Sequence, residues 1–238
     1  GMVRPGDDRI RMHRRLYAED TDAGLRASSR LRDDDRAIAK AWVAVDHKTA
    51  NAKALLEAVP DSARHDAGYV FSRARWLRRA DRVAEAGHLL LTVHVAAADV
   101  LNTDQWWIER RLIARKLLDA HDPKSAYRIV YDAVPPTKDN YRVDREFTAG
   151  WIALRFLGDP STAMRHFAAI AQSTGNPTAL ARAGYWQGRA AEAMNHAREA
   201  RSYYATASRY RTTYYGQLAR ARLGEADIAL QTPPTPSA

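Results

Sequence analysis

The stretch Ala153-Leu-Arg-Phe-Leu-Gly-Asp-Pro-Ser-Thr-Ala163 aligns without gaps with three other eleven-residue segments of the chain. Those segments run from Ala74 to Ala84, from Lys116 to Ala126 and from Ala190 to Ala200. Three of the four have alanine at both ends, and the closing alanines are 42, 37 and 37 residues apart. Self-similarity at such a period is typical of helical-repeat proteins, in which each repeat is a helix, a tight turn and a second helix.

Helix-start signals lie within and beyond these segments. Asp122-Pro123 and Asp159-Pro160 occupy equivalent positions, and Asn176-Pro177 has the same form. Aspartate or asparagine caps a helix, and a proline at the first helical position loses nothing by lacking an N–H. Apolar residues follow at helical spacing, as at positions 127, 130, 131 and 134. The sequence therefore predicts an all-α superhelical solenoid of antiparallel helix pairs, tetratricopeptide-like but irregular in its spacing.

The regularity of this pattern suggests three parts of the chain. Residues 1–65 are expected to form less regular N-terminal helices, and residues 66–225 the helical-repeat solenoid. Residues 226–238 end in Thr232-Pro-Pro-Thr-Pro-Ser-Ala238, which is typical of an extended linker. We expect this linker to lead to a further C-terminal region that is missing from the chain.

Charge and composition restrict the classes of partner. Lysine and arginine number 37 against 28 acidic residues, which gives a net charge of +9 and favours anionic partners. The simpler interpretation is a solvated, arginine-rich surface. Cysteine is absent, so the sequence predicts neither a disulfide framework nor a thiolate metal site. No stretch approaches the roughly 20 apolar residues of a membrane span, and none is expected.

Motifs of known enzymes are absent from the sequence. It contains no phosphate-binding glycine loop, no nucleophile elbow and no His-Glu-x-x-His pair, and its eight histidines are scattered. Each of the eight glutamates is interpreted as a surface acid, either solvated or paired with a nearby arginine, as Glu109 would be with Arg110 and Arg111. We therefore predict no catalytic residue, no cofactor and no metal.

Aromatic pairs beside arginines mark a candidate contact surface. Tryptophan or tyrosine with arginine can stack on sugar rings or bases, and this singles out the following side chains: Trp106, Trp107, Arg110, Arg111, Tyr203 and Tyr214. The alternative is packing. In that interpretation one tryptophan lies in the core and the other at a helix contact, and one tyrosine of each pair, 203–204 and 214–215, points inward.

Several stretches resemble parts of the soluble lytic murein transglycosylases of bacteria. They are Asp144-Arg-Glu-Phe-Thr-Ala-Gly-Trp-Ile-Ala-Leu-Arg-Phe-Leu-Gly-Asp-Pro160, Ala181-Arg-Ala-Gly-Tyr-Trp-Gln-Gly-Arg-Ala190 followed by Tyr203-Tyr204, and Thr212-Thr-Tyr-Tyr-Gly-Gln-Leu-Ala219. Trp106-Trp-Ile-Glu-Arg-Arg111 with Ala114-Arg-Lys-Leu-Leu118 is similar to the alphaproteobacterial branch. The resemblance covers roughly residues 68–224 and is strongest from residue 144 onward.

This resemblance implies a periplasmic protein with a long α-superhelical region and a separate lysozyme-like C-terminal domain. In the family, that domain cleaves the bond between N-acetylmuramic acid and N-acetylglucosamine and leaves a 1,6-anhydro end. Family catalysis depends on a glutamate followed by serine, and none of the eight glutamates here precedes a serine. The chain would then be a non-catalytic domain that binds or positions peptidoglycan for the missing catalytic domain.

Two other functions remain open. A tetratricopeptide-like array can also serve as a protein–protein interaction module. A nucleic-acid-binding repeat would rest on charge alone, because the sequence lacks the orderly one-base-per-repeat pattern of such proteins, and no nucleic-acid partner is expected.

Overall fold

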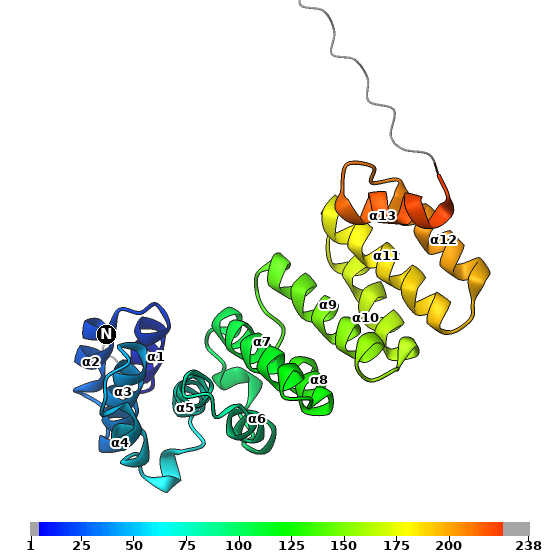
Figure 1. Ribbon diagram of the computed structural model, residues 1–238. Helices are drawn as coiled ribbons and strands as arrows, with labels where there is room; N and C mark the ends of the chain where they lie inside the picture. Colours follow the sequence, from blue (N-terminus) through cyan, green and yellow to red (C-terminus); the bar gives the residue numbers. More distant parts are fainter. Residues whose placement is uncertain (1–4, 226–238) are drawn as a thin grey trace, which may run out of the picture. The chain divides into compact units, whose positions relative to one another are not determined.

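The computed structural model describes residues 5–225, and in this part of the chain every regular element is a helix (Figure 1). The linker predicted for residues 226–238 lies outside the described residues. Contacts divide the chain into two compact units, Gly1–Arg145 and Glu146–Ala238, called here unit 1 and unit 2. This division falls inside a helix. The boundary between residues 65 and 66, which was expected from the regularity of the sequence repeat, stays a prediction.

Unit 1 contains eight α-helices among its described residues, before the helix that crosses the boundary. They are α1 (Pro5–Tyr17), α2 (Thr21–Ser28), α3 (Asp33–Asp46), α4 (Ala52–Glu57), α5 (Ala67–Arg79), α6 (Val83–Thr92), α7 (Thr103–Asp119) and α8 (Pro123–Tyr131). Two 3-10 turns, η1 (Asp61–Ala63) and η2 (Ala97–Asp99), join α4 to α5 and α6 to α7.

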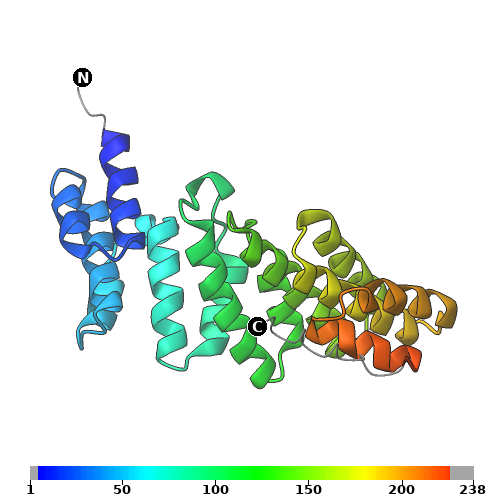
Figure 2. The same cartoon turned by 90° about the horizontal axis from the view of Figure 1, so that it is seen from above.

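Unit 2 begins within α9 (Asp139–Arg155). It continues with α10 (Pro160–Ser173), α11 (Pro177–Ala193), α12 (Ala197–Ser208) and α13 (Tyr214–Leu223). Consecutive helices pack against each other in both units, α5 on α6 and α7 on α8 in the first, α10 on α11 and α11 on α12 in the second (Figure 2). The predicted all-α fold of tetratricopeptide-like, antiparallel helix pairs is confirmed.

One backbone feature recurs at the turn inside the helix pairs. A residue there adopts a left-handed conformation, with φ near +60°, and the positions are Glu19, Lys48, Asp81, His121, Gly158 and Asn195. The next N–H then closes the end of the first helix, as when Asp122 N donates to Leu117 O over 2.8 Å. This bond satisfies a carbonyl that the helix end would otherwise leave free. The sequence repeat therefore reflects one repeated helix-ending turn.

The turns extend and correct the repeat that the sequence suggests. The first two of these turns are at Glu19 and Lys48, so helix pairs are also present in residues 1–65, which were expected to be less regular. In the first aligned segment the left-handed residue is Asp81, two positions later than the gapless alignment places it. The last four turns are consequently 40, 37 and 37 residues apart.

Aromatic rings fill the core of unit 1 between successive helix pairs. Tyr17 lies 4.7 Å from Trp42, measured between ring centroids, and Trp42 lies 5.4 Å from Phe71. Phe71 in turn lies 5.5 Å from Trp106 on α7. Since these residues come from α1, α3, α5 and α7, the rings connect consecutive pairs into one core.

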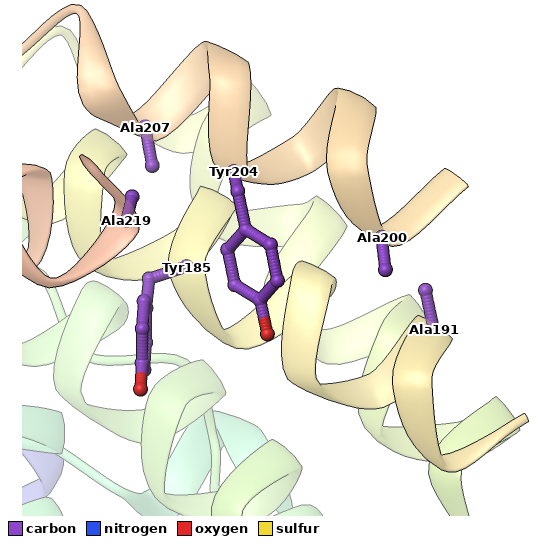
Figure 3. Packing of buried hydrophobic residues seen from close by; sticks show 6 residues of the cluster. All are labelled: Tyr185, Ala191, Ala200, Tyr204, Ala207 and Ala219. Carbon is purple, nitrogen blue, oxygen red and sulfur yellow. The ribbon is translucent and has the colours of Figure 1, made fainter. Parts of the chain in front are cut away.

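Small residues allow the helices of unit 2 to approach closely. Tyr204 on α12 fills the space opposite Gly188 on α11, where a Cβ atom would lie 2.4 Å from the tyrosine ring. Figure 3 shows this ring pointing between the helices, beside Tyr185, while Ala191 faces Ala200 and Ala207 faces Ala219. Ala200 is the closing alanine of the fourth aligned segment, so the small residue at that repeat position lies at a close contact between α11 and α12.

Candidate functional site

The two tryptophans singled out by sequence are both buried in α7. Trp106 is 4% exposed and its Nε1 donates to the Tyr17 hydroxyl over 2.6 Å. Trp107 is fully buried and its Nε1 donates to Asp144 Oδ2 over 3.1 Å. Neither ring presents a face on which a sugar or base could stack. Both tryptophans therefore pack inside unit 1 and do not form a contact surface. The packing alternative placed one of them in the core and the other at a helix contact, whereas the structure buries both rings.

The neighbouring arginines are also engaged within unit 1. Arg110 Nη1 donates to the Ile129 carbonyl over 2.9 Å, and burial lowers the pKa of Arg110 to about 10. Arg111 Nη1 lies 2.8 Å from Asp144 Oδ2, the same oxygen that accepts from Trp107. The four candidates on α7 therefore bond to α1 through Trp106, to α8 through Arg110, and to Asp144 of α9 through Trp107 and Arg111.

In each tyrosine pair of unit 2, one ring points inward, as the packing alternative predicts. Tyr204 is 3% exposed, while Tyr203 is half-buried and packs against the same cluster. Tyr215 contacts Tyr185 with 5.5 Å between ring centroids, whereas Tyr214 is 67% exposed. Among the six candidate side chains, Tyr214 is thus the aromatic residue with an exposed ring. It belongs to unit 2, whereas the four candidates of α7 belong to unit 1.

A buried charge network was not predicted from the sequence. Glu109 is only 3% exposed, and its partners are Arg75 and Arg78 of α5 rather than the adjacent Arg110 and Arg111. Arg75 also donates to Asp46 Oδ1 over 2.6 Å, and burial is the largest influence on Asp46 and raises its pKa. Because both Glu109 oxygens are bonded to guanidinium groups, this acid is part of the architecture.

The sequence indicates the two arginines of this network but not their acidic partner. Arg75 and Arg78 are three residues apart and so share one side of α5. A buried partner acid 31 residues away from Arg78 cannot be distinguished, on sequence alone, from the other acids of the chain.

A pocket of about 960 Å³ in unit 1 is lined in part by charged groups that pair with each other. Arg9 lies between Asp35, at 3.1 Å from its Nε, and Asp66, which it also contacts. His13 is buried beside Asp66, with 3.6 Å between Nε2 and Oδ1, and burial lowers its pKa. This part of the pocket wall is therefore charge-compensated.

Exposed arginines gather on the outer side of α12 and on the turn that follows it. Four of them, Arg198, Arg201, Arg209 and Arg211, are exposed and have no ion pair within residues 5–225. The acidic residue of α12, Glu199, lies 3.4 Å from His196 instead. Residues 146–225 contain ten arginines, no lysine and five acidic residues, so unit 2 carries an excess of positive charge.

No group of three or more histidine, aspartate or glutamate side chains between residues 5 and 225 could hold a metal ion. In the same range, no helix combines the length and the apolar character that crossing a membrane requires.

Comparison with known proteins provides little further guidance. No family model matches the sequence, and no curated protein matches it. Among solved structures, the chain is similar to the crystal structure of the MamA protein, with a TM-score of 0.42 and 13% sequence identity. That alignment covers 94% of this chain and 98% of the MamA chain. A similarity of this size bears on neither the function nor the partners of this chain.

Proposed function

We propose that the chain is the non-catalytic helical region of a peptidoglycan lytic transglycosylase, which binds or positions murein in the periplasm for a separate glycan-cleaving domain. Peptidoglycan and that catalytic domain are its proposed partners. The proposal builds on the sequence stretches that resemble the family. The structural observation that carries it is the packing of those stretches in unit 2.

The stretches of α11, α12 and α13 that carry the resemblance pack against one another in unit 2. Gly188 of the α11 stretch receives the ring of Tyr204 from the tyrosine pair of α12. Tyr215, from the Thr-Tyr-Tyr-Gly-Gln stretch, contacts Tyr185 on α11. These residues lie on the successive helices α11, α12 and α13. The stretches on which the resemblance rests thus supply the side chains that join these three helices.

Gly216 shows how specific this packing is. A Cβ atom at this position would lie 2.0 Å from the carbonyl oxygen of Tyr210, which is far inside van der Waals contact. Thr213 caps α13, since its Oγ1 accepts from Gly216 N over 3.0 Å. The Thr213-Tyr-Tyr-Gly216 sequence thus specifies a close turn between α12 and α13 that leaves Tyr214 exposed.

Charge supports a carboxylate-bearing partner. The stem peptides of peptidoglycan carry free carboxylates, and the unpaired arginines of unit 2 would attract them. Within residues 5–225 the acids that the structure buries, such as Glu109, are bonded to arginines, so the module is proposed to bind and not to cleave.

A pull-down with purified sacculi tests this function. The protein is incubated with sacculi at low and high salt, and turbidity is followed in parallel. We expect binding at low salt, weaker binding at high salt because exposed charge pairs are screened, and constant turbidity. A fall in turbidity would contradict the absence of catalysis, and absence of binding at low salt would contradict the murein-binding role.

The second candidate is a tetratricopeptide-like protein–protein interaction module. The repeated helix pair, with the same turn from Glu19 to Asn195, favours it, because such arrays expose extended helix faces to partners. This candidate would be favoured over the first if the protein does not bind sacculi at any salt concentration. Circular dichroism would first have to show that the protein is folded and helical.

A further inference from the structure

The pocket of about 960 Å³ in unit 1, called here the unit 1 pocket, is lined by more than the paired groups around Arg9. Four segments of the described residues contribute to it: α1, the turn from α2 into α3, η1 with the start of α5, and η2 with Leu101. Its volume lies at the upper end of the range of about 300–1,000 Å³ that is usual for small-molecule sites.

The paired groups fix one part of the lining. Arg9 of α1 binds both Asp35 of α3 and Asp66, so its guanidinium joins three helices. Asp66 also caps α5, since its Oδ1 accepts from Gly68 N over 2.7 Å and from Tyr69 N over 3.2 Å. This part of the unit 1 pocket is therefore formed before any ligand arrives, which lowers the entropic cost of binding.

His13 places a buried polar atom in the lining of this pocket. Its side chain is 4% exposed, and its Nε2 makes no hydrogen bond within residues 5–225. Asp66 Oδ1 is 3.6 Å from this nitrogen, beyond hydrogen-bonding distance, and Asp66 is already bonded to the α5 N–H groups and to Arg9. Burial lowers the pKa of His13, so its ring is neutral. A buried polar atom without a partner is costly, and a ligand group in the pocket would supply the missing bond.

Charges of both signs line the same pocket. Asp34 of α3 and Asp99 of η2 have no ion pair within the described residues, and neither have Arg30 and Arg32 of the α2–α3 turn. Asp99 is near His13, since it is one of the acids that oppose the lowering of the His13 pKa by burial. A ligand with a single sign of charge would pair with two of these four groups and be repelled by the other two.

Apolar side chains also line the unit 1 pocket. Ile10 of α1 is a large hydrophobic residue with 40% of its surface exposed. Leu31, Ile38 and Leu101 belong to the same lining. A ligand with an aliphatic part would therefore remove apolar surface from water while its charged groups pair with the lining.

We infer that the unit 1 pocket binds a short peptide that has free ends and an aliphatic side chain. The ammonium group of this peptide pairs with Asp34 and Asp99, and the aliphatic side chain lies on the apolar lining. The carboxylate pairs with Arg30 and Arg32, whose planar groups can each donate two parallel hydrogen bonds. A peptide group completes the hydrogen bonding of His13 Nε2. This inference concerns unit 1 and does not depend on murein binding.

Simple ions fit the unit 1 pocket less well. An inorganic anion would be attracted by Arg30 and Arg32 but repelled by Asp34 and Asp99, and a small cation would meet the reverse. Neither ion would cover the exposed part of Ile10. The combination of both charges with an apolar lining therefore favours a zwitterion with an aliphatic part.

The test uses the whole chain and the tripeptide alanyl-leucyl-alanine in three forms. The first form has free ends, the second is acetylated and lacks the ammonium group, and the third is amidated and lacks the carboxylate. Binding is followed by nuclear magnetic resonance titration. We expect the free form to shift the His13 Nε2 resonance and the amide resonances of the lining segments, while resonances of unit 2 stay unchanged.

Two double variants assign the two ends of the peptide. The acid variant is Asp34→Asn with Asp99→Asn, and the arginine variant is Arg30→Gln with Arg32→Gln. In the unaltered chain, acetylation and amidation should each lower the affinity about two- to five-fold, because exposed ion pairs contribute modestly. The acid variant should bind the free and acetylated forms equally, and the arginine variant should bind the free and amidated forms equally.

A matched control removes one acid and one arginine outside the lining. It is Asp22→Asn with Arg26→Gln, and both residues are exposed on α2. This variant should bind all three forms of the tripeptide as the unaltered chain does. Circular dichroism verifies that every variant is folded.

Several outcomes would overturn the inference. They are absence of binding by the free tripeptide, shifts confined to unit 2, and an unchanged His13 Nε2 resonance at saturation. The assignment of the ends would be wrong if acetylation still lowered the affinity of the acid variant, or amidation that of the arginine variant, as much as in the unaltered chain. Sacculus binding is measured separately, so failure of the peptide site leaves the proposed function standing.

Discussion

Unit 1 and unit 2 are built from the same helix-ending turn, and each contains paired and unpaired arginines. In unit 1, Arg75 and Arg78 bind Glu109, an acid that is only 3% exposed. In unit 2, Arg189 and Arg222 share the more exposed Glu192, and four arginines have no acidic partner within the described residues: Arg198, Arg201, Arg209 and Arg211. A count of arginines in a sequence therefore does not measure the charge available to a ligand. Pairing, which depends on the fold, decides which arginines stabilise the protein and which are free to bind.

The largest effect is expected at the buried network of unit 1. Glu109→Ala leaves Arg78 without its acidic partner and Arg75 with Asp46 alone, and it should destabilise unit 1 by about 3–5 kcal/mol. Hydrogen exchange should accelerate in α5 and α7 and remain unchanged in α11 to α13. Glu85→Ala, which removes an exposed acid paired with Arg82, is the matched control and should leave exchange unaltered. Uniform acceleration in both units would contradict this division.

The second-largest effect is expected in unit 2, where the substitution disturbs a close backbone contact and not a charge pair. Gly216→Ala should destabilise the α12–α13 turn by about 1–3 kcal/mol, because the new methyl group meets the Tyr210 carbonyl. Gly175→Ala is the control, since a methyl group added at Gly175 would have no atom within 4 Å. Urea denaturation measures both variants. Equal stability of the two would show that the turn relaxes easily.

A smaller gain in stability is expected at the repeated turn. His121→Gly should stabilise unit 1 by about 1 kcal/mol, because a left-handed conformation is strained for a residue with a side chain. Asn195→Gly in unit 2 should gain less, since asparagine tolerates this conformation better than histidine does. Thermal unfolding of the two variants compares them, and a loss of stability in His121→Gly would mean that its side chain has an additional role.

The smallest expected effect is a difference in the response to acid. Burial raises the pKa of Asp46 in unit 1, so the folded state holds the proton more tightly and gains stability as pH falls toward the ordinary aspartate pKa. Hydrogen bonds from Thr162 lower the pKa of Asp159 in unit 2, so its contribution is present above the ordinary value and is lost as pH falls through the lowered pKa.

Urea denaturation between pH 7 and pH 3 compares the unaltered chain with Asp46→Asn and with Asp159→Asn. As the pH falls, the free energy of unfolding of the unaltered chain should rise relative to that of Asp46→Asn. It should fall relative to that of Asp159→Asn. The same direction in both comparisons would contradict the assigned causes of the two pKa changes.

The sequence predicted the helix pairs well where the turn chemistry is explicit. Asp122-Pro123 and Asp159-Pro160 begin α8 and α10, and each aspartate accepts from a backbone N–H of the first turn. The helices around Glu19 and Lys48 were expected to be less regular, because the aligned eleven-residue segments do not extend into residues 1–65. The left-handed conformation at these positions is adopted by ordinary residues, so local sequence gives no signal.

The candidate surface was harder to predict than the fold. Trp106 and Trp107 were selected as adjacent aromatics near arginines, yet Tyr17 and Asp144 bond their ring nitrogens inside unit 1. Such contacts join residues 89 and 37 positions apart, which a local pattern cannot contain. Tyr214 was selected by the same criterion and is exposed, because the Thr213 cap and Gly216 direct its neighbour Tyr215 inward.

The most direct test of binding through unit 2 is the salt dependence of sacculus binding for the unaltered chain and two variants of equal charge. The unit 2 variant replaces four exposed arginines by glutamine: Arg198, Arg201, Arg209 and Arg211. The unit 1 variant replaces four exposed cations by glutamine: Arg14, Arg26, Lys40 and Arg115. If the free arginines of unit 2 carry binding, affinity should fall with salt for the unaltered chain and for the unit 1 variant. The unit 2 variant should bind weakly and respond little to salt. The same steep salt dependence in all three proteins would contradict the claim that unit 2, and not net charge, holds the ligand.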